Sequence, residues 1–313
     1  MLRWAASSLS GLGAWPGTGG EIGLQIPARQ AMERGASAGG RLVDLTRREP
    51  HGRNQKCTWD LVMAISQEPS DRAAAAWIIA DEIMLARTNL DTLAYRLWRE
   101  AALDGEKLAD EDRQHVLSYA SPVFEANDRT QVTGYIGEWL WYLSTRDLTP
   151  EPGRSVEIID PPSGTVTDSG PDGLVIHRLE GSALGFVFRL WEVKKLTGTA
   201  SKPSDTIRGA WKQLNKNGAR YLGQMAWGGR RLSPDTEQFV SSLVRQWVSA
   251  QESSSGGVSL ALNAADAPST AFDRSHEHFT THTHAGALQG LVVAVEELED
   301  FADDVREYVW SAL

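Results

Sequence analysis

Apolar residues recur at three- and four-residue spacings over several long stretches of the chain, which is the period of an amphipathic helix. The first stretch covers 70–103 and opens with a Ser-Asp capping signal, and others cover 110–124 and 131–145. Two more helices are expected, one following Pro203 and one over 233–251. These stretches predict a protein with a large helical component.

A period of two replaces the helical period further along the chain, which predicts β-strands. The two clearest strands are DGLVIHRLE (172–180) and GFVFRLWEVKK (185–195), joined through the turn GSALG as a hairpin. Shorter strands are expected at 156–159 and 258–263. The order helix, strand, strand, strand, helix, strand fits an α/β sandwich with a mixed sheet.

Three parts are expected along the 313 residues: an irregular N-terminal segment (1–57), a helical subdomain (58–128) and an α/β domain (129–313). The first part lacks a sustained apolar period. In the last part, the apolar run LQGLVVAV passes into an acidic helix that reaches the C-terminus. The chain is long enough to bury a full hydrophobic core.

Composition restricts the cellular setting that we expect for the protein. No run of eighteen apolar residues occurs, so no membrane span is expected. The single cysteine, Cys57, cannot form an internal disulfide and fits a reducing cytoplasm. Serine and glycine interrupt the apolar start of the chain, which favours a disordered or mis-started leader over a secretory signal.

Basic residues gather in one segment, although the whole chain carries a formal charge of −10. Between 189 and 231 there are ten Lys or Arg and two Asp or Glu, so this segment carries +8 and the remainder −18. Such segregation predicts a surface that faces phosphate groups, and the alternative is a solvated amphipathic helix. The residues expected to contact nucleic acid are Lys195, Lys202, Arg208, Lys212, Lys216 and Arg220.

Charged residues also mark the ends of the predicted hairpin strands. Glu192 and Lys194 lie two apart on one strand and so share a face, and the hairpin brings Asp172 roughly opposite Val193. The two carboxylates can hold Mg²⁺, with the Val193 carbonyl and Glu138 from the aromatic-rich helix as further candidate ligands. Lys194 would orient or help deprotonate a water molecule and offset charge in a transition state.

The same residues also have a structural interpretation. Asp172 in Gly-Pro-Asp-Gly is a favourable turn residue, and Glu192 with Lys194 could form an exposed pair on a strand. Large apolar neighbours at 186, 188, 190 and 191 indicate that this strand is buried. Because buried acids are rare without a partner, the functional interpretation is favoured.

Histidines form a second cluster, and several nucleotide and hydrolase motifs are absent from the sequence. The cluster lacks the cysteine or HExxH pattern of a zinc site, which favours a polar loop or a phosphate-contacting edge. Its members are His276, His278, His282 and His284. The isolated His115 and His177 are expected to be structural. No Walker motif, GxGxxG or GxSxG occurs, which argues against an NTPase, a dinucleotide enzyme or an α/β-hydrolase.

The GEWLWYL helix with Glu138, the GPDGL strand with Asp172, and the triplet Glu192-Val193-Lys194 resemble the PD-(D/E)XK nuclease superfamily. Within it they are similar to the HamA family, the nuclease subunits of bacterial Hachiman antiphage defence, over roughly 131–264. The resemblance implies a restriction-endonuclease-like α-β-β-β-α-β core. It also implies Mg²⁺ as cofactor, with Mn²⁺ as a substitute, DNA as substrate and a helicase partner.

The resemblance extends to the helix that follows the strand lysine. Gln213 stands where several superfamily members carry a helix glutamine, whereas Tyr221 lies further along than the usual pattern. We therefore expect a cytoplasmic, metal-dependent endodeoxyribonuclease. The alternative is a catalytically silent nuclease-fold module that binds nucleic acid or a partner protein, docking through 58–128 and the acidic C-terminal helix.

Overall fold

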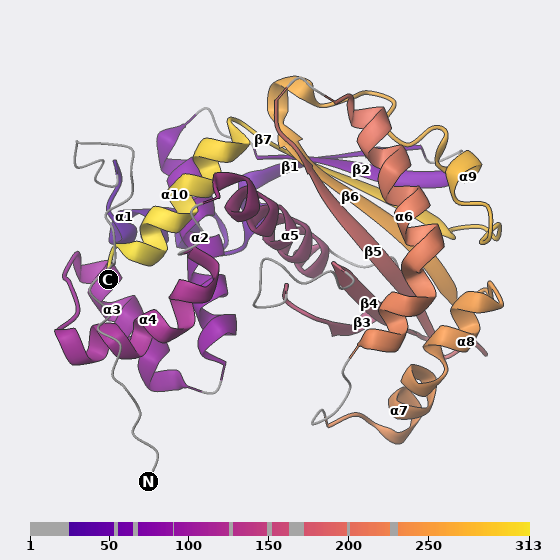
Figure 1. Ribbon diagram of the computed structural model, residues 1–313, viewed down its shortest axis with the longest axis horizontal. Coiled ribbons are helices and arrows are strands. Elements are labelled where there is room, and N and C mark those ends of the chain that lie inside the picture. Colours follow the sequence, from indigo (N-terminus) through magenta and orange to yellow (C-terminus); the bar gives the residue numbers. More distant parts are fainter. Residues whose placement is uncertain are drawn as a thin grey trace, which may run out of the picture.

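A seven-stranded mixed sheet with helices on both faces forms the centre of the protein (Figure 1). The computed structural model describes 25–52, 56–64, 68–89, 91–124, 128–148, 152–162, 172–198, 201–225 and 231–313. The N-terminal leader lies outside these described residues. The sheet order is β1-β2-β7-β6-β5-β4-β3. The strands are β1 (Thr46–His51), β2 (Cys57–Ala64), β3 (Arg154–Ile159), β4 (Gly173–Leu179), β5 (Phe186–Leu196), β6 (Ser254–Asn263) and β7 (Leu288–Val295).

The four central strands β2, β7, β6 and β5 run parallel, and antiparallel strands flank them at both edges. The predicted hairpin is confirmed as β4 and β5, with Gly173 opposite Trp191. Extending this register by one residue sets Asp172 opposite Glu192, one position from the Val193 that the sequence predicted. The predicted mixed sheet is therefore also confirmed.

The described residues form ten α-helices and two short 3₁₀ helices, and every helix predicted from the apolar period has a counterpart. The helix expected over 233–251, however, is divided at Ser242 into two short helices. The run over 70–103 is divided at Asn89, which has a positive φ of 49°, and Asp91 caps the second helix by accepting a hydrogen bond from the Ala94 N–H. The helices are α1 (Ala28–Ala38), η1 (Leu42–Leu45), α2 (Pro69–Thr88), α3 (Thr92–Asp104), α4 (Asp110–Phe124), α5 (Arg129–Asp147), α6 (Pro203–Gln224), α7 (Pro234–Ser241), α8 (Leu243–Val248), η2 (Ala264–Asp266), α9 (Ser275–His278) and α10 (Leu298–Trp310).

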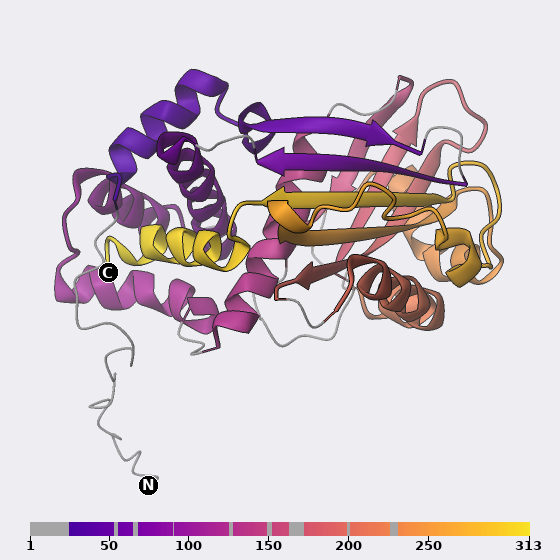
Figure 2. The same cartoon turned by 90° about the horizontal axis from the view of Figure 1, so that it is seen from above.

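Two hydrophobic cores lie on the two faces of the sheet. On one face, α5 packs against Trp191 and Val193 of β5, and this core continues into α1–α4 and α10, which gather beside one end of the sheet (Figure 1, Figure 2). On the other face, α6 and α8 pack against Leu190 of β5 and its neighbours. Side chains of β5 therefore alternate between the two cores, as a strand buried on both faces requires.

The predicted N-terminal organisation is wrong in the described residues. The segment 1–57, which was expected to be irregular, contains α1 and β1. The expected helical subdomain, 58–128, begins within strand β2 and so belongs partly to the sheet. In α1 only the small residues Ala28, Ala31 and Gly35 are buried, so the sequence gives little apolar signal. Strand β1 (TRREPH) is polar because it lies at an edge.

The helical region is also bound to the C-terminal helix. Trp77 of α2 meets Tyr308 of α10 edge to face at 5.7 Å between ring centroids, and Arg72 pairs with Asp304 at 2.6 Å. Helices α2 and α10 therefore share one core and do not form separate domains. In the part of the chain that the structure describes, no helix combines the length and apolar character that a bilayer crossing needs.

Candidate functional site

The C-terminal half of β5 carries an ion pair whose buried carboxylate has one unsatisfied oxygen. Glu192 is 1% exposed, and its Oε1 accepts a hydrogen bond from Lys194 Nζ at 2.5 Å. Its other oxygen, Oε2, is buried and has no hydrogen-bond partner among the described residues. Leaving such an oxygen unpaired is costly, so a further hydrogen-bond donor or a cation at Oε2 would be favourable.

Asp172 joins this pair from the start of β4. Its Oδ2 accepts a hydrogen bond from the Val193 N–H at 2.6 Å. The backbone groups of successive strand residues point alternately to the two neighbouring strands. The Phe188 N–H donates to the Ser253 carbonyl on the β6 side at 2.8 Å. Val193 lies an odd number of residues further along, so its N–H and C=O point toward β4. The Val193 carbonyl and the Asp172 carboxylate therefore lie along the same strand edge.

Glu138 reaches the same group from α5, on the opposite face of the sheet. Burial raises its pKa to about 8, and the charges of Asp172 and Glu192 act in the same direction, whereas Lys194 opposes them. Glu138 is therefore within electrostatic range of the hairpin residues. Helix α5 can approach the strands closely because Gly137 has no side chain. A Cβ at this position would lie 3.4 Å from the Cβ of Ala261 on β6.

The charge of Asp172 disfavours the ionisation of Glu138 and Glu192. Burial raises the pKa of Glu192 to about 7, and the charge of Asp172 adds to this effect. Burial likewise raises the pKa of Asp172, although Lys194 and the Val193 N–H partly offset it. Excess negative charge in a poorly solvated position is the electrostatic condition under which a divalent cation binds favourably.

Lys194 remains a cation in this environment. Burial lowers its pKa, but the charges of Glu192 and Asp172, with a smaller contribution from Tyr221, outweigh burial and hold its pKa above the usual value. A lysine in this state is a poor proton acceptor at neutral pH. The geometry favours a role for Lys194 in orienting a water molecule and offsetting negative charge, rather than in deprotonation.

Helix α6 adds a polar flank beside Lys194. Gln213 Nε2 donates to the Tyr221 hydroxyl at 3.0 Å, and Asn217 Nδ2 lies 3.4 Å from the same oxygen. These residues are four apart, so they share one side of the helix. Tyr221, which the sequence left outside the usual spacing, acts electrostatically on Lys194 from this side of α6, and Asn217 was not predicted.

An exposed basic stripe runs along α6 next to this flank. Four of the predicted nucleic-acid contacts recur every four residues and are all exposed: Arg208, Lys212, Lys216 and Arg220. Lys202 is exposed at the start of the helix. Lys195 lies elsewhere, because it points to the opposite face of β5, where its ammonium donates to the Thr130 carbonyl of α5. The structure does not bring Lys195 to the stripe.

The histidine cluster is not a polar loop throughout. His282 is 2% exposed, its Nε2 lies 3.0 Å from the Ser254 hydroxyl, and its ring stacks on Phe279 at 5.2 Å. Burial lowers its pKa to about 4, with a contribution from His284. The prediction is therefore wrong for His282, which is a neutral core residue.

The described residues contain no group of three His, Cys, Asp or Glu side chains arranged to hold a metal ion. Mg²⁺, however, is commonly bound by one or two carboxylates with water completing the shell. Asp172, Glu192 and the Val193 carbonyl fit that smaller donor set. The unpaired Oε2 of Glu192 and the raised carboxyl pKa values favour a cation at this position.

We expect the metal-free protein to lose stability as pH rises from about 5 to about 8. The carboxyl groups of the folded state bind protons more tightly than those of the unfolded state, whose glutamates titrate near pH ~4.3. Stability is therefore highest below that pH and falls as the pH rises through the carboxyl pKa values of the folded state. For Glu192, with a pKa of about 7, the loss is at most roughly 4 kcal/mol.

Urea unfolding in EDTA at several pH values measures this loss. Glu192→Gln should flatten the pH dependence, whereas the control Glu100→Gln, at an exposed position on α3, should leave it unchanged. Identical pH profiles for Glu192→Gln and the parent protein would contradict the prediction.

Comparisons of this chain with protein-family models, with curated proteins and with solved structures return no match. The resemblance to the PD-(D/E)XK superfamily therefore depends on the sequence motifs alone.

Proposed function

We propose that this protein is a metal-dependent endodeoxyribonuclease of the PD-(D/E)XK type. The observation that carries the proposal is the meeting of Asp172, Glu192 and Lys194 at one end of the β4–β5 hairpin, with one Glu192 oxygen buried and unpaired. The element order α5, β3, β4, β5, α6, followed later by β6, supports the restriction-endonuclease-like core that the resemblance implies.

Asp172, Glu192 and the Val193 carbonyl would hold the cation, with Glu138 beside them. A bound Mg²⁺ would supply Lewis acidity toward a phosphoryl oxygen and relieve the repulsion among the carboxylates. Lys194 would orient the attacking water and offset charge that develops on the phosphate. Gln213 and Tyr221 would fix this lysine from the α6 side.

Incubation of supercoiled plasmid with the purified protein tests the proposal. We expect nicked circles with Mg²⁺ or Mn²⁺ and none with EDTA. DNA that is bound but never cut under any of these conditions would instead favour the alternative, a silent nuclease-fold module.

We further propose, on the resemblance of the GEWLWYL and GPDGL segments to HamA, that the nuclease acts in antiphage defence with a helicase partner. If so, a helicase encoded beside this gene should bind the protein and change its nicking rate. Unchanged nicking in the presence of that helicase would count against the partnership and leave the nuclease proposal intact.

The basic stripe of α6 should provide salt-dependent affinity for DNA. Lys212→Gln combined with Lys216→Gln removes two exposed cations, so the slope of log affinity against log salt should fall by about 2, with weaker binding to every sequence. Fluorescence anisotropy with a labelled duplex at several salt concentrations measures both effects.

A matched control removes two exposed arginines from the other end of the molecule. Arg29→Gln with Arg96→Gln, on α1 and α3, loses the same charge and should keep the original salt slope. Equal slopes for the two double variants would show that net charge, rather than the stripe, governs binding.

A further inference from the structure

A cavity of about 630 Å³ opens beside the loop that connects α9 to β7, and this loop carries histidines that the hairpin site does not use. Thr58 and Leu288 line it from the starts of β2 and β7, which pair in parallel. Figure 1 shows α9 and this loop at the opposite end of the molecule from α1–α4. We call this space the histidine-loop cavity. Glu192 and Lys194 do not line it, so it is distinct from the hairpin site.

The polar side chains that line the histidine-loop cavity include a cation and no carboxylate. Lys56 is exposed and forms no ion pair with any described residue. Three hydroxyl groups and two imidazole rings of the lining also make no side-chain hydrogen bond within the described part of the chain: Thr58, Thr280, Thr283, His276 and His284. A cation with neighbouring hydroxyl donors suits an anion that has several acceptor oxygens, such as a phosphate group.

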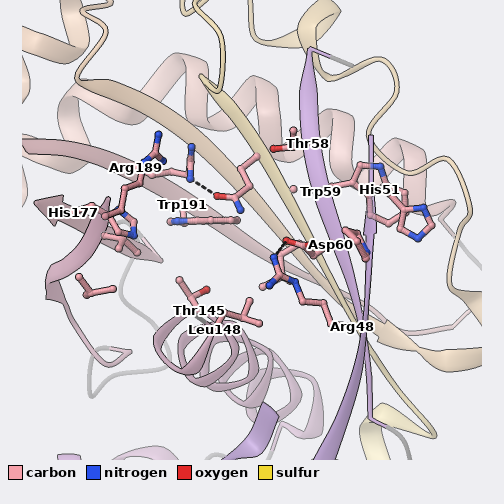
Figure 3. A pocket seen from close by; sticks show the side chains of 17 residues that line it. Arg48, His51, Thr58, Trp59, Asp60, Thr145, Leu148, His177, Arg189 and Trp191 are labelled. Carbon is pink, nitrogen blue, oxygen red and sulfur yellow. Dashed lines mark hydrogen bonds and ion pairs between the residues drawn. The ribbon is translucent and has the colours of Figure 1, made fainter. Parts of the chain in front are cut away.

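Another cavity, of about 360 Å³ on the α5 side of the sheet, has a different kind of lining (Figure 3). Asp60 lines it and pairs with Arg48 at 2.8 Å. Arg189, also in this lining, donates to the Gln289 side chain, and Figure 3 shows both contacts. The charged groups there are engaged with one another or with polar neighbours. The histidine-loop cavity is therefore the better place for an anionic ligand.

An apolar surface lies beside the polar groups of the histidine-loop cavity. Phe279 and Leu288 line the cavity and belong to the hydrophobic core, and Ala285 lines it from the loop. The Phe279 ring is held by Trp211 of α6, with 5.3 Å between the ring centroids. A volume of this size, with an apolar surface and a few polar groups, is typical of sites for small organic groups. An inorganic phosphate would leave the apolar surface uncontacted, whereas the sugar or base of a nucleotide would cover it.

The histidine-loop cavity also adjoins the basic stripe of α6. Burial, with the charge of Lys212 from the stripe, lowers the pKa of His278. His278 belongs to the four-residue helix α9, and His276 of the same helix lines the cavity. In addition, the Thr281 hydroxyl donates to the side chain of Asn215 on α6 at 3.1 Å. The loop that forms the cavity is therefore attached to the helix that carries the stripe.

We propose that the histidine-loop cavity holds one nucleotide unit of a DNA strand that continues from the α6 stripe. Lys56 and the threonine hydroxyls would contact its phosphate, and the apolar surface would contact its sugar or base. This inference rests on the proposed function, because it requires that the stripe binds DNA. A free nucleotide has the same chemistry, but the adjoining stripe, which would bind the neighbouring phosphates, favours a strand.

Fluorescence anisotropy in EDTA, with labelled single-stranded and duplex DNA, tests this site without any cleavage. Lys56→Gln should weaken the binding of at least one of these probes at least threefold and lower the salt slope by about 1, because one phosphate contact is lost. Ala285→Glu places a carboxylate in the cavity from an exposed position and should weaken binding at least tenfold. If circular dichroism shows that one variant does not fold, the other variant decides the outcome.

Matched controls make the same charge changes at the other end of the molecule. Arg96→Gln on α3 and Ala36→Glu on α1 alter exposed positions and should leave the affinity and the salt slope unchanged. Unchanged affinity in the folded cavity variants, or equal losses in the controls, would overturn the proposal. Displacement of the DNA by deoxynucleoside 5′-monophosphates, at concentrations where inorganic phosphate has no effect, would identify a free nucleotide as the occupant and overturn the assignment to a strand.

The outcome for the cavity is separable from the outcome for the nuclease. If both folded cavity variants bind DNA as the parent does, and the parent nicks plasmid with Mg²⁺, the cavity proposal fails and the nuclease proposal stands. If the cavity variants lose affinity but the parent never nicks, the nuclease proposal fails and the cavity proposal stands. Absence of DNA binding by the parent protein would overturn the cavity proposal, and the nicking assay would then decide the nuclease proposal by itself.

Discussion

Lys194→Met is expected to reduce metal-dependent nicking by about 10²–10³-fold, the loss typical of removing one group that stabilises transition-state charge. Lys194 contacts Glu192 and is held as a cation by the surrounding carboxylates. Methionine keeps most of the side-chain volume and removes the charge. Initial rates of plasmid nicking measure the effect, with circular dichroism to confirm the fold.

The adjacent residue provides a matched control for this change. Lys195 differs from Lys194 by one position but lies on the other face of β5, against α5. Lys195→Met removes the same charge from the chain and should retain nicking within a few-fold of the parent. Comparable loss in both variants, or full activity in both, would refute the role assigned to Lys194.

Gly173→Ala is expected to lower the free energy of unfolding by roughly 3 kcal/mol or more, at the upper end of the range for overpacked cores. A Cβ at this position would lie 1.9 Å from the ring of Trp141, which is fully buried on α5. Neither the strand nor the ring can move without disturbing the core. Because Asp172 precedes this glycine, its hydrogen bond to Val193 should also be disrupted.

Urea denaturation of Gly173→Ala beside Gly209→Ala measures the cost. Gly209 is an exposed position on α6 with no atom within 4 Å of its added Cβ, so alanine there should stabilise the protein by about 0.5–1 kcal/mol. The two substitutions should therefore change stability in opposite directions. Equal stabilities would mean that the Trp141 contact relaxes without cost.

The elements around the site could be predicted because they are rich in apolar residues or regularly patterned. Helix α6 buries one regular set of positions, whereas β5 is buried on both faces and α5 on nearly all sides. Strand alternation alone paired Glu192 with Lys194. The edge strand β1 carries no such signal because its residues are polar. The position of β1 in the sheet depends on its antiparallel pairing with β2, which lies close to it in the chain. Strand β2 in turn pairs with β7, which is distant in the sequence.

Some site residues depend on geometry that a sequence does not display. Glu138 reaches the hairpin only because α5 crosses the sheet at one particular place. Lys195 was grouped with the basic helix, although strand alternation separates it from Lys194. The cavity on the α5 side was not predicted because its cationic residues lie as far apart in the chain as Arg48 and Arg189.

The order of strands in the sheet limits how the chain can be divided. Strand β7, from the C-terminal part, lies between β6 and β2, so the N-terminal part of the chain covers one of its edges. Its sequence LQGLVVAV is almost entirely buried. A shortened fragment beginning at residue 129 would expose this apolar strand as an unpaired edge, the kind of surface that promotes aggregation. The segment 129–313 is therefore not an independent module that could be transplanted without the N-terminal strands that complete its sheet.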